Sequence, residues 1–293
     1  MYMWIRIYAT HSCAALFRMD DTATLFIFYD LETTGRSTKK DRIVQIAASF
    51  VFENEALATF SSYVCPDGGL RKPRSMAPGA ARVTGIRDKL LLDKPSFNVV
   101  WTHRFLPALK EATKHVTFDR ICCAGYNNWR FDDVILTREI AGCGRCIASD
   151  LGVASEGMFS WDVFKDAKLF FNKRTDAQGN KLVPNHRLGT VYEHITGEPL
   201  MNAHDALSDV NATFRISRHS ALMQSFRVGT NVRPWHRAEE KLAPPVPIVV
   251  RFFKQPTDAT EKPVENLKQS SCRVCDACGN AVSVYFDHMC EGF

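Results

Sequence analysis

The hydrophobic pattern of the first 125 residues predicts strands first and a helix later. Three apolar segments rich in β-branched and aromatic residues are separated by polar connections, as is typical of consecutive strands. An amphipathic stretch and a short, wholly apolar segment follow them. The predicted elements are strands over 25–31, 42–52 and 58–64, a helix over 97–113 and a strand over 121–125.

Helical periodicity dominates the segment that follows, with predicted helices over 127–141, 187–196 and 203–224. Strands followed by strands that alternate with helices indicate a mixed α/β sheet. From residue 231 onward, prolines interrupt every periodic pattern, which is typical of an extended linker. The predicted organisation is an N-terminal extension (1–23), an α/β domain (24–230), a proline-rich linker (231–271) and a small Cys-rich C-terminal tail (272–293).

Composition limits the class of protein without identifying it. The chain has 293 residues and 45% hydrophobic content, enough for one large domain or a domain with an appendage. It contains no apolar run near the ~20 residues that span a bilayer, so we expect no membrane partner. The net charge of +5 is compatible with nucleic-acid binding but does not require it.

The ten cysteines favour a reducing intracellular compartment, cytoplasm or nucleus, over a secreted disulfide scaffold. Four of them lie in the last 22 residues, which indicates a local site and not a framework. Residues 1–18 contain Arg6 and Arg18 but no acidic residue, so mitochondrial targeting is the alternative. We interpret this segment as an extension, with Met19 as an alternative start to Met1.

Two carboxylates stand at the end of the first predicted strand, in the segment FIFYDLETTG. Side chains alternate between the faces of a strand, so Asp30 and Glu32 should point the same way, a few ångströms apart. Like charges this close raise each other's proton affinity unless a cation lies between them. The pair is either a solvated strand end or half of a metal site, and a metal site predicts further acidic residues downstream.

The segment NAHDALSDVNATF supplies one such residue near the end of the α/β domain. We predict a capping box in which Asn202 is the N-cap and Asp205 the N3 acid of a helix. His204 would then lie in the first turn, about 140° around an ideal helix from Asp209. The two side chains can serve one site only if His204 swings out from a frayed helix start.

The segment GYNNWRFDD supplies another acid, Asp132, in the first turns of the helix that follows the strand ending at Gly125. Taken alone, Asp132 would be an ordinary first-turn aspartate favoured by the helix dipole. We interpret its neighbours Phe131 and Trp129 as core packing and not as stacking platforms for bases, with the stacking role as an open alternative for Trp129.

Together these segments place Asp-x-Glu on a strand, Asn-x-x-Phe-Asp at a helix start and His-x-x-x-x-Asp late in the domain. This order resembles the histidine-bearing branch of the DEDD superfamily of 3′–5′ exonucleases. The segments APGAARVTGI, HRLGTVYEHITG and NAHDALSDVNAT resemble the bacterial exonuclease I family, whose members degrade single-stranded DNA. The resemblance covers residues 24–223 and implies a ribonuclease H-like mixed sheet flanked by helices.

The resemblance also implies a two-metal hydrolysis of phosphodiester bonds that releases mononucleotides. Two divalent ions, Mg²⁺ or Mn²⁺, would lie about 4 Å apart among the carboxylates. Asp30, Glu32 and Asp209 would hold the first ion. Asp30 would bridge to the second, which Asp132 would support. His204 would be the general base, because imidazole titrates close to neutral pH.

The expected substrate is the 3′ end of single-stranded DNA, in DNA repair or replication. By resemblance, Thr33 and Thr34 would contact the terminal nucleotide, and the VTGI segment with Thr84, Gly85 and Ile86 would pack against the terminal bases. Such contacts grip sugar, phosphate and base with little sequence readout.

Four other readings remain, of which the first three use the same residues or fold. An exoribonuclease that trims RNA ends and a proofreading exonuclease partnered with a polymerase would both need the same five catalytic residues. A silent nucleic-acid-binding adaptor is opposed by the complete acidic set. A zinc-dependent interaction module would leave the α/β domain unexplained.

The tail offers ligands for one structural zinc ion, and a redox-labile tail is the equal alternative. The candidate ligands are Cys272, Cys275, Cys278, His288 and Cys290.

Two further motifs are weaker. Cys143 and Cys146 form another Cys-x-x-Cys, but they lack nearby partners and we interpret them as loop and core residues. The segment VPIVVRFFK has the hydrophobic spacing of a sliding-clamp-binding peptide in Val249, Phe252 and Phe253, with Val246 in place of the customary glutamine. We favour an apolar patch that packs on the domain, with a clamp partner as the alternative.

Overall fold

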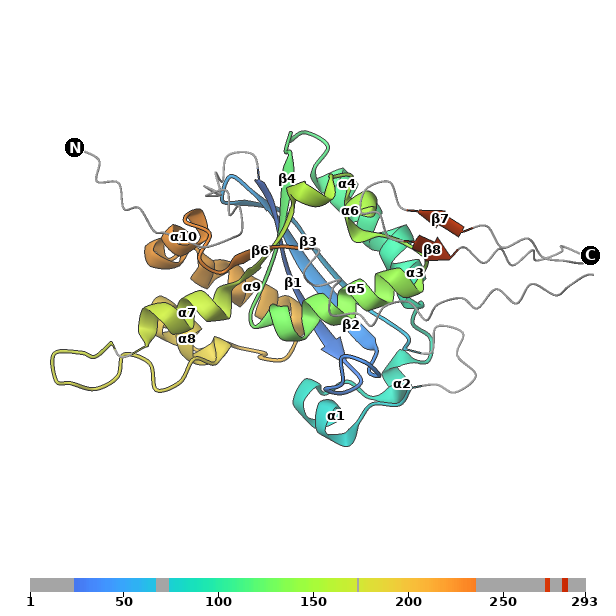
Figure 1. Cartoon of the computed structure of the whole chain (residues 1–293). Coiled ribbons are helices and arrows are strands. Elements are labelled where there is room, and N and C mark those ends of the chain that lie inside the picture. Colours follow the sequence, from blue (N-terminus) through green and yellow to red (C-terminus); the bar gives the residue numbers. More distant parts are fainter. Residues whose placement is uncertain (1–23, 67–73, 173, 236–271, 275–280, 284–293) are drawn as a thin grey trace, which may run out of the picture.

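The structure, a computed structural model, describes residues 24–66, 74–172 and 174–235 (Figure 1). It also describes two short strands that pair with each other, β7 (Cys272–Val274) and β8 (Ala281–Ser283). The predicted extension 1–23 and the clamp-like segment 246–253 lie outside the described residues, and so do Cys275, Cys278, His288 and Cys290. Of Cys272 only the backbone in β7 is described.

A six-stranded mixed sheet forms the centre of the described domain, in the order β3-β2-β1-β4-β5-β6. β2 is antiparallel to β1 and β3, β4 is parallel to β1 and β5, and β6 is antiparallel to β5. The predicted α/β class is confirmed. The strands are β1 (Thr24–Thr33), β2 (Ile43–Phe52), β3 (Glu55–Tyr63), β4 (Arg120–Gly125), β5 (Met158–Asp162) and β6 (Val232–Pro234).

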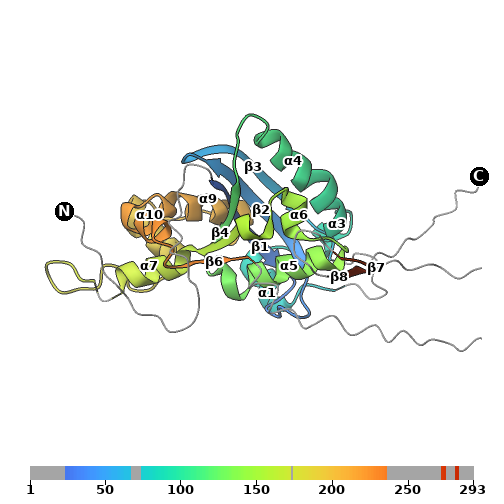
Figure 2. The ribbon, with the colours of Figure 1, turned by 45° about the horizontal axis from the view of Figure 1, so that its top comes forward.

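Helices cover both faces of the sheet (Figure 2). One face carries α3 (Phe97–Val100), the π-helical turn η2 (Trp101–Phe105), α4 (Leu106–Ala112), α5 (Asp132–Gly142) and α6 (Ile147–Leu151). The other carries α7 (Val163–Phe171), α8 (Leu188–Thr196), α9 (Ala206–Ser217) and α10 (Ser220–Arg227). The short 3₁₀ turns are η3 (Asn128–Arg130) and η4 (Ser155–Gly157).

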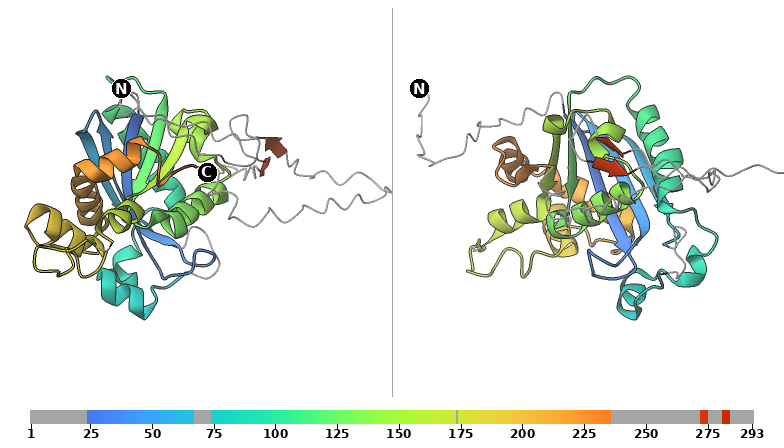
Figure 3. Two further views of the ribbon diagram at one scale, coloured as in Figure 1. Left: turned by 60° about the vertical axis from the view of Figure 1, so that its left-hand side comes forward. Right: turned by 45° about the vertical axis from the view of Figure 1, so that its right-hand side comes forward.

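Two further short helices, α1 (Pro78–Thr84) and α2 (Asp88–Leu91), lie beyond the end of the sheet at which β1 finishes (Figure 3). Among the described helices, none has the length and apolar character needed to cross a bilayer.

Alternation along β1 sorts its side chains between two cores. Leu25, Ile27 and Tyr29 pack in the core under α3 to α6, whereas Phe26 and Phe28 pack in the core under α7 to α10. Continuing this alternation puts Asp30 and Glu32 on the same face as the two phenylalanines, the face on which α9 packs. The period-2 argument from the sequence therefore correctly predicts that the two carboxylates share a face.

The differences from the predicted elements have local causes. The helix predicted over 203–224 is two helices, because His219 caps a new one, its Nδ1 accepting the N–H of Ala221 at 3.3 Å. The helix predicted from residue 127 begins at Asp132, after η3. The strand β5 was missed because all five of its residues are buried, so it shows no alternation.

The sheet also extends past residue 230, where the sequence predicts a linker. β6 pairs with β5, with Arg233 opposite Ser160. Trp235, 2% exposed, packs in the core under α3 to α6. The three residues of β6 include Pro234, which is tolerated because β6 is an edge strand.

Candidate active site

Glu32, His204 and Asp209 lie together where β1 ends, and Asp30 and Asp132 are near enough to interact electrostatically with this cluster. Asp30 and Glu32 come from β1, Asp132 is the first residue of α5, and Asp209 lies in the first turn of α9. Three potential metal-ligating atoms lie within 4.8 Å of one another: a carboxylate oxygen of Glu32, a ring nitrogen of His204 and a carboxylate oxygen of Asp209. The register of β1 against β2 shifts between Glu32 and Thr33, and such bulges often re-aim side chains beside active sites.

The electrostatics of this cluster show that the carboxylates crowd one another. Burial, followed by the charges of Asp209 and Asp205, raises the pKa of Asp30 from 3.8 to about 8. Burial and the neighbouring charge of Asp30 raise the pKa of Glu32 to about 9. Burial and the charge of Asp30 likewise raise the pKa of Asp132 well above its usual range. The cluster therefore favours a positive charge among its oxygens.

Asp209 provides a second sign that the cluster is shaped for a cation. Its Oδ1 is buried and has no hydrogen-bond partner among the described residues, whereas Oδ2 accepts the backbone N–H of His204 at 3.2 Å. Burial raises the pKa of Asp209 to about 6, although the hydrogen bond from His204 opposes the shift. Buried acceptors are normally satisfied, so a bound ion is a natural partner for the orphaned oxygen.

His204 does not lie in a helix, which corrects the predicted capping box. The N-cap of α9 is Asp205, whose side chain accepts the N–H of Ser208 at 3.1 Å, and Asn202 belongs to the preceding turn. Both Asn202 (φ 56°) and His204 (φ 69°) have left-handed backbone conformations. This tight turn, and not a frayed helix end, brings the exposed imidazole to the carboxylates.

Sequence reasoning missed two side chains of the site. Asp205 was assigned to helix capping alone, yet its charge raises the pKa of Asp30, Glu32 and Asp209. Gln45 of β2, 3% exposed, donates to Asp205 Oδ2 at 3.1 Å and lies opposite Glu32 in the strand register. The available signal was a glutamine within a largely apolar strand.

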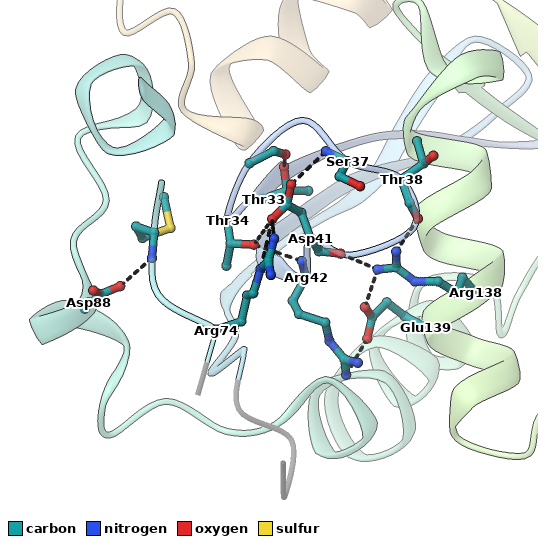
Figure 4. A network of polar contacts seen from close by, with 12 residues as sticks. Thr33, Thr34, Ser37, Thr38, Asp41, Arg42, Arg74, Asp88, Arg138 and Glu139 are labelled. Atoms are coloured by element: carbon teal, nitrogen blue, oxygen red, sulfur yellow. Dashed lines mark hydrogen bonds and ion pairs between the residues drawn. The ribbon is translucent and has the colours of Figure 1, made fainter. Parts of the chain in front are cut away.

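The loop between β1 and β2 is organised around the buried carboxylate of Asp41 (Figure 4). Asp41 accepts hydrogen bonds from the Thr34 hydroxyl (3.0 Å), the Ser37 N–H (2.7 Å) and the Arg74 guanidinium (2.9 Å). Although burial acts in the opposite direction, the bonds from Ser37 and Arg74 hold the pKa of Asp41 below its ordinary value. Through Arg74, this carboxylate links the loop to the segment that leads into α1.

The hydroxyls of the two threonines predicted to contact substrate are used within this loop. Thr33 Oγ1 donates to the carbonyl of Gly35 at 2.7 Å. Thr34, fully buried, also accepts the N–H of Arg42 at 3.0 Å. Both side chains therefore shape the loop next to the carboxylates.

A Gly35→Ala variant is expected to lose about 1–3 kcal/mol of unfolding free energy. A Cβ at Gly35 would lie 2.6 Å from Asp41 Oδ2, so the carboxylate would have to move away from its three donors. The matched control is Gly79→Ala in α1, where a Cβ would meet nothing within 4 Å and alanine is the better helix former. Urea denaturation of both variants measures the difference; equal midpoints would contradict the role given to Asp41.

The VTGI segment forms the end of α1. Thr84 Oγ1 donates to the Ala80 carbonyl at 3.1 Å, and Gly85 adopts the left-handed C-cap conformation with φ 72°. Ile86 is 3% exposed in a small core with Val44 and Leu91. Ile86 is therefore packed inside the protein.

The remaining predicted packing residues are partly buried. As predicted, three of these residues pack against the core under α3 to α6: Phe131, Cys143 and Cys146. Trp129 is covered by two cations, with Lys165 Nζ 3.9 Å and the Arg233 guanidinium carbon 4.7 Å from its ring centroid.

Comparison with known proteins relates this arrangement to nucleases. The chain is 28% identical over 202 residues to exodeoxyribonuclease I of Escherichia coli strain K12. This alignment covers 66% of this chain and 39% of the relative. It is 33% identical over 72 residues to the DNA polymerase III subunit epsilon of Treponema pallidum, covering 25% of this chain and 31% of the relative. The chain thus matches well under half the length of these relatives.

Solved structures show the same fold. A structure of exonuclease I aligns with 71% of this chain and 41% of its own, with a TM-score of 0.51 and 23% identity. Exonuclease I of Escherichia coli bound to a dT13 oligonucleotide gives a TM-score of 0.51 and 23% identity over 70% of this chain and 41% of that chain. The family model described as Exonuclease (RNase_T) matches residues 27–217, which span all five clustered residues, and the chain therefore belongs to this exonuclease family.

Proposed function

We propose that this protein is a metal-dependent 3′–5′ exonuclease that hydrolyses single-stranded DNA to mononucleotides. The observation that carries the proposal is the grouping of Glu32, His204 and Asp209 at the end of β1, with Asp30 and Asp132 near enough to interact electrostatically with this group. The relative named exodeoxyribonuclease I supports DNA as the substrate, and the clustered carboxylates support a divalent cation as the cofactor.

The residues present fit a pair of divalent ions. Asp30, Glu32 and Asp209 would hold one ion, where the orphaned Oδ1 of Asp209 is available as a ligand. Asp132, whose charge interacts with that of Asp30, would hold the other. When bound, such ions supply a water of lowered pKa and stabilise the charge that develops on the phosphate.

The chain itself supplies proton transfer and orientation. His204 Nδ1 or Nε2 would accept the proton from the attacking water, since it is the exposed basic group beside Glu32 and Asp209. The backbone N–H of His204 donates to Asp209 Oδ2, which holds the left-handed turn and ties the position of the imidazole to a proposed metal ligand.

The direct test uses purified protein with Mg²⁺ or Mn²⁺ and single- and double-stranded DNA and RNA oligonucleotides, labelled at either the 3′ or the 5′ end. Immediate release of labelled mononucleotide from the 3′ label, with a ladder of shortening products from the 5′ label, is expected on single-stranded DNA. Faster hydrolysis of RNA would assign the site to RNA trimming. No hydrolysis of any substrate with either ion would overturn the proposal.

Metal binding is expected to strengthen as pH rises from about 6 to about 9. The pKa values of about 8 for Asp30 and about 9 for Glu32 mean that a cation must displace protons in this range. Each displaced proton contributes up to about tenfold in affinity per pH unit. Calorimetric Mn²⁺ titrations in buffers of different ionisation enthalpy measure both the affinity and the protons released. Affinity that does not change with pH would show that the ion binds elsewhere.

A further inference from the structure

The carboxylate next to Asp132 in the chain is buried at the centre of a polar network. Asp133 has no exposed surface, and each of its oxygens accepts two hydrogen bonds. Oδ1 accepts from Tyr29 Oη (2.5 Å) and Asn128 Nδ2 (2.8 Å), and Oδ2 accepts from Ser160 Oγ (2.7 Å) and the Arg233 guanidinium (2.7 Å). This is nearly the full acceptor capacity of a carboxylate.

The four donors come from four different elements. Tyr29 lies on β1, Asn128 on η3, Ser160 on β5 and Arg233 on β6. The antiparallel register that places Ser160 opposite Arg233 aims both side chains at the same oxygen of Asp133. The network therefore fixes the start of α5 relative to three strands of the sheet.

Two members of this network are chain neighbours of candidate metal ligands. Asp133 follows Asp132, and Tyr29 precedes Asp30. The hydrogen bond between Tyr29 and Asp133 thus joins the backbone positions that present Asp30 and Asp132.

Arg233 is the cation of the network. Its side chain is 9% exposed, it forms the ion pair with the fully buried Asp133, and its guanidinium lies over the Trp129 ring and donates to the Trp129 carbonyl at 3.3 Å. A buried carboxylate that loses its counter-charge is strongly unfavourable. Removing Arg233 should therefore displace Asp133 and, with it, the first turn of α5.

We infer that Arg233 is a positioning residue of the active site. Through Asp133 it fixes the position of the Asp132 carboxylate, which in the proposed function serves the second metal position. It acts from β6, outside residues 27–217 that match the family model, in a segment whose sequence reads as a linker. The short edge strand is therefore part of the catalytic apparatus, and the activity readout of this inference rests on the proposed function.

The test compares Mn²⁺ affinity, measured calorimetrically without substrate, in wild type, Arg233→Met and a control of general destabilisation. Supporting side chains behind metal ligands typically contribute about 10–100-fold to metal affinity or activity. Arg233→Met should lose metal affinity, and kcat on a labelled oligonucleotide, by that factor. The control is Leu222→Ala, fully buried in the core under α7 to α10, which should lower Tm and keep Mn²⁺ affinity.

A second variant covers the case in which Arg233→Met does not fold. The double variant Asp133→Asn with Arg233→Met leaves no unpaired buried charge, so its Tm should lie above that of Arg233→Met, and its Mn²⁺ affinity should still fall at least tenfold. Wild-type Mn²⁺ affinity in either folded variant would overturn the inference. Absence of hydrolysis by wild type would instead overturn the proposed function, while the binding comparison would still decide the role of Arg233.

Discussion

Asp30→Asn is expected to reduce turnover by about 10³-fold. Asp30 interacts with Glu32, Asp132 and Asp209, so it lies at the centre of the acidic cluster. A neutral amide cannot balance the charge of two cations. Because such ions stabilise the transition state by several kcal/mol, and about 1.4 kcal/mol is tenfold in rate, the loss reaches this size.

The same substitution should stabilise the metal-free protein. The pKa of Asp30 is about 8 in the folded state against 3.8 ordinarily, so the folded state holds the proton more tightly than the unfolded chain. The stability that this carboxyl contributes is fully present below about pH 4 and is lost as pH rises through about 8. Asparagine stays neutral, so its gain in Tm over wild type should grow across that window.

Steady-state hydrolysis of a labelled oligonucleotide and thermal unfolding in EDTA measure these two opposite effects. Asp93→Asn is the matched control, because Asp93 is an exposed aspartate that forms an ion pair with Lys94, and its substitution should leave turnover unchanged. A variant that is both inactive and less stable at pH 9 would point to misfolding. Retained turnover would remove Asp30 from the site.

Local geometry fixes where some of the acidic side chains stand, whereas their assembly into one cluster was predicted from the resemblance to the exonuclease family. Strand alternation puts Asp30 and Glu32 on one face whatever the rest of the fold, and a helix start places Asp132 at the tip of α5. The turn before α9 has no such rule. Its left-handed residues allow Asp205, and not Asn202, to cap the helix, and only the folded structure shows the charge of Asp205 entering the site.

The edge of the sheet could not be predicted for a different reason. β6 is three residues long and contains a proline, so its sequence is not distinguishable from that of a linker. What fixes it is tertiary: pairing with β5, burial of Trp235 and the buried ion pair of Arg233 with Asp133. Asp133 carries no signal of its own in the sequence, because the residues that bind it are separated from it by up to 104 positions.

His204→Asn is expected to lower kcat by about 10²–10⁴-fold, the range that a positioned general base contributes. Asparagine is chosen because His204 has φ 69°, a left-handed conformation that asparagine tolerates better than alanine. The turn and its hydrogen bond to Asp209 Oδ2 should therefore survive, and only the imidazole is lost.

The measurement must separate a base from a metal ligand, since the imidazole lies within ligand distance of Glu32 and Asp209. A base predicts that Mn²⁺ affinity stays at the wild-type value while kcat falls, whereas a ligand predicts that both fall together. His115→Asn, on an exposed turn before β4, is the control for a histidine change away from the site. Unchanged kcat in His204→Asn would assign proton transfer to another group.

Because Asp209 supports both the proposed metal position and the backbone of His204, the variant Asp209→Asn should lose metal affinity and turnover together. The His204→Asn variant should lose turnover and keep metal affinity.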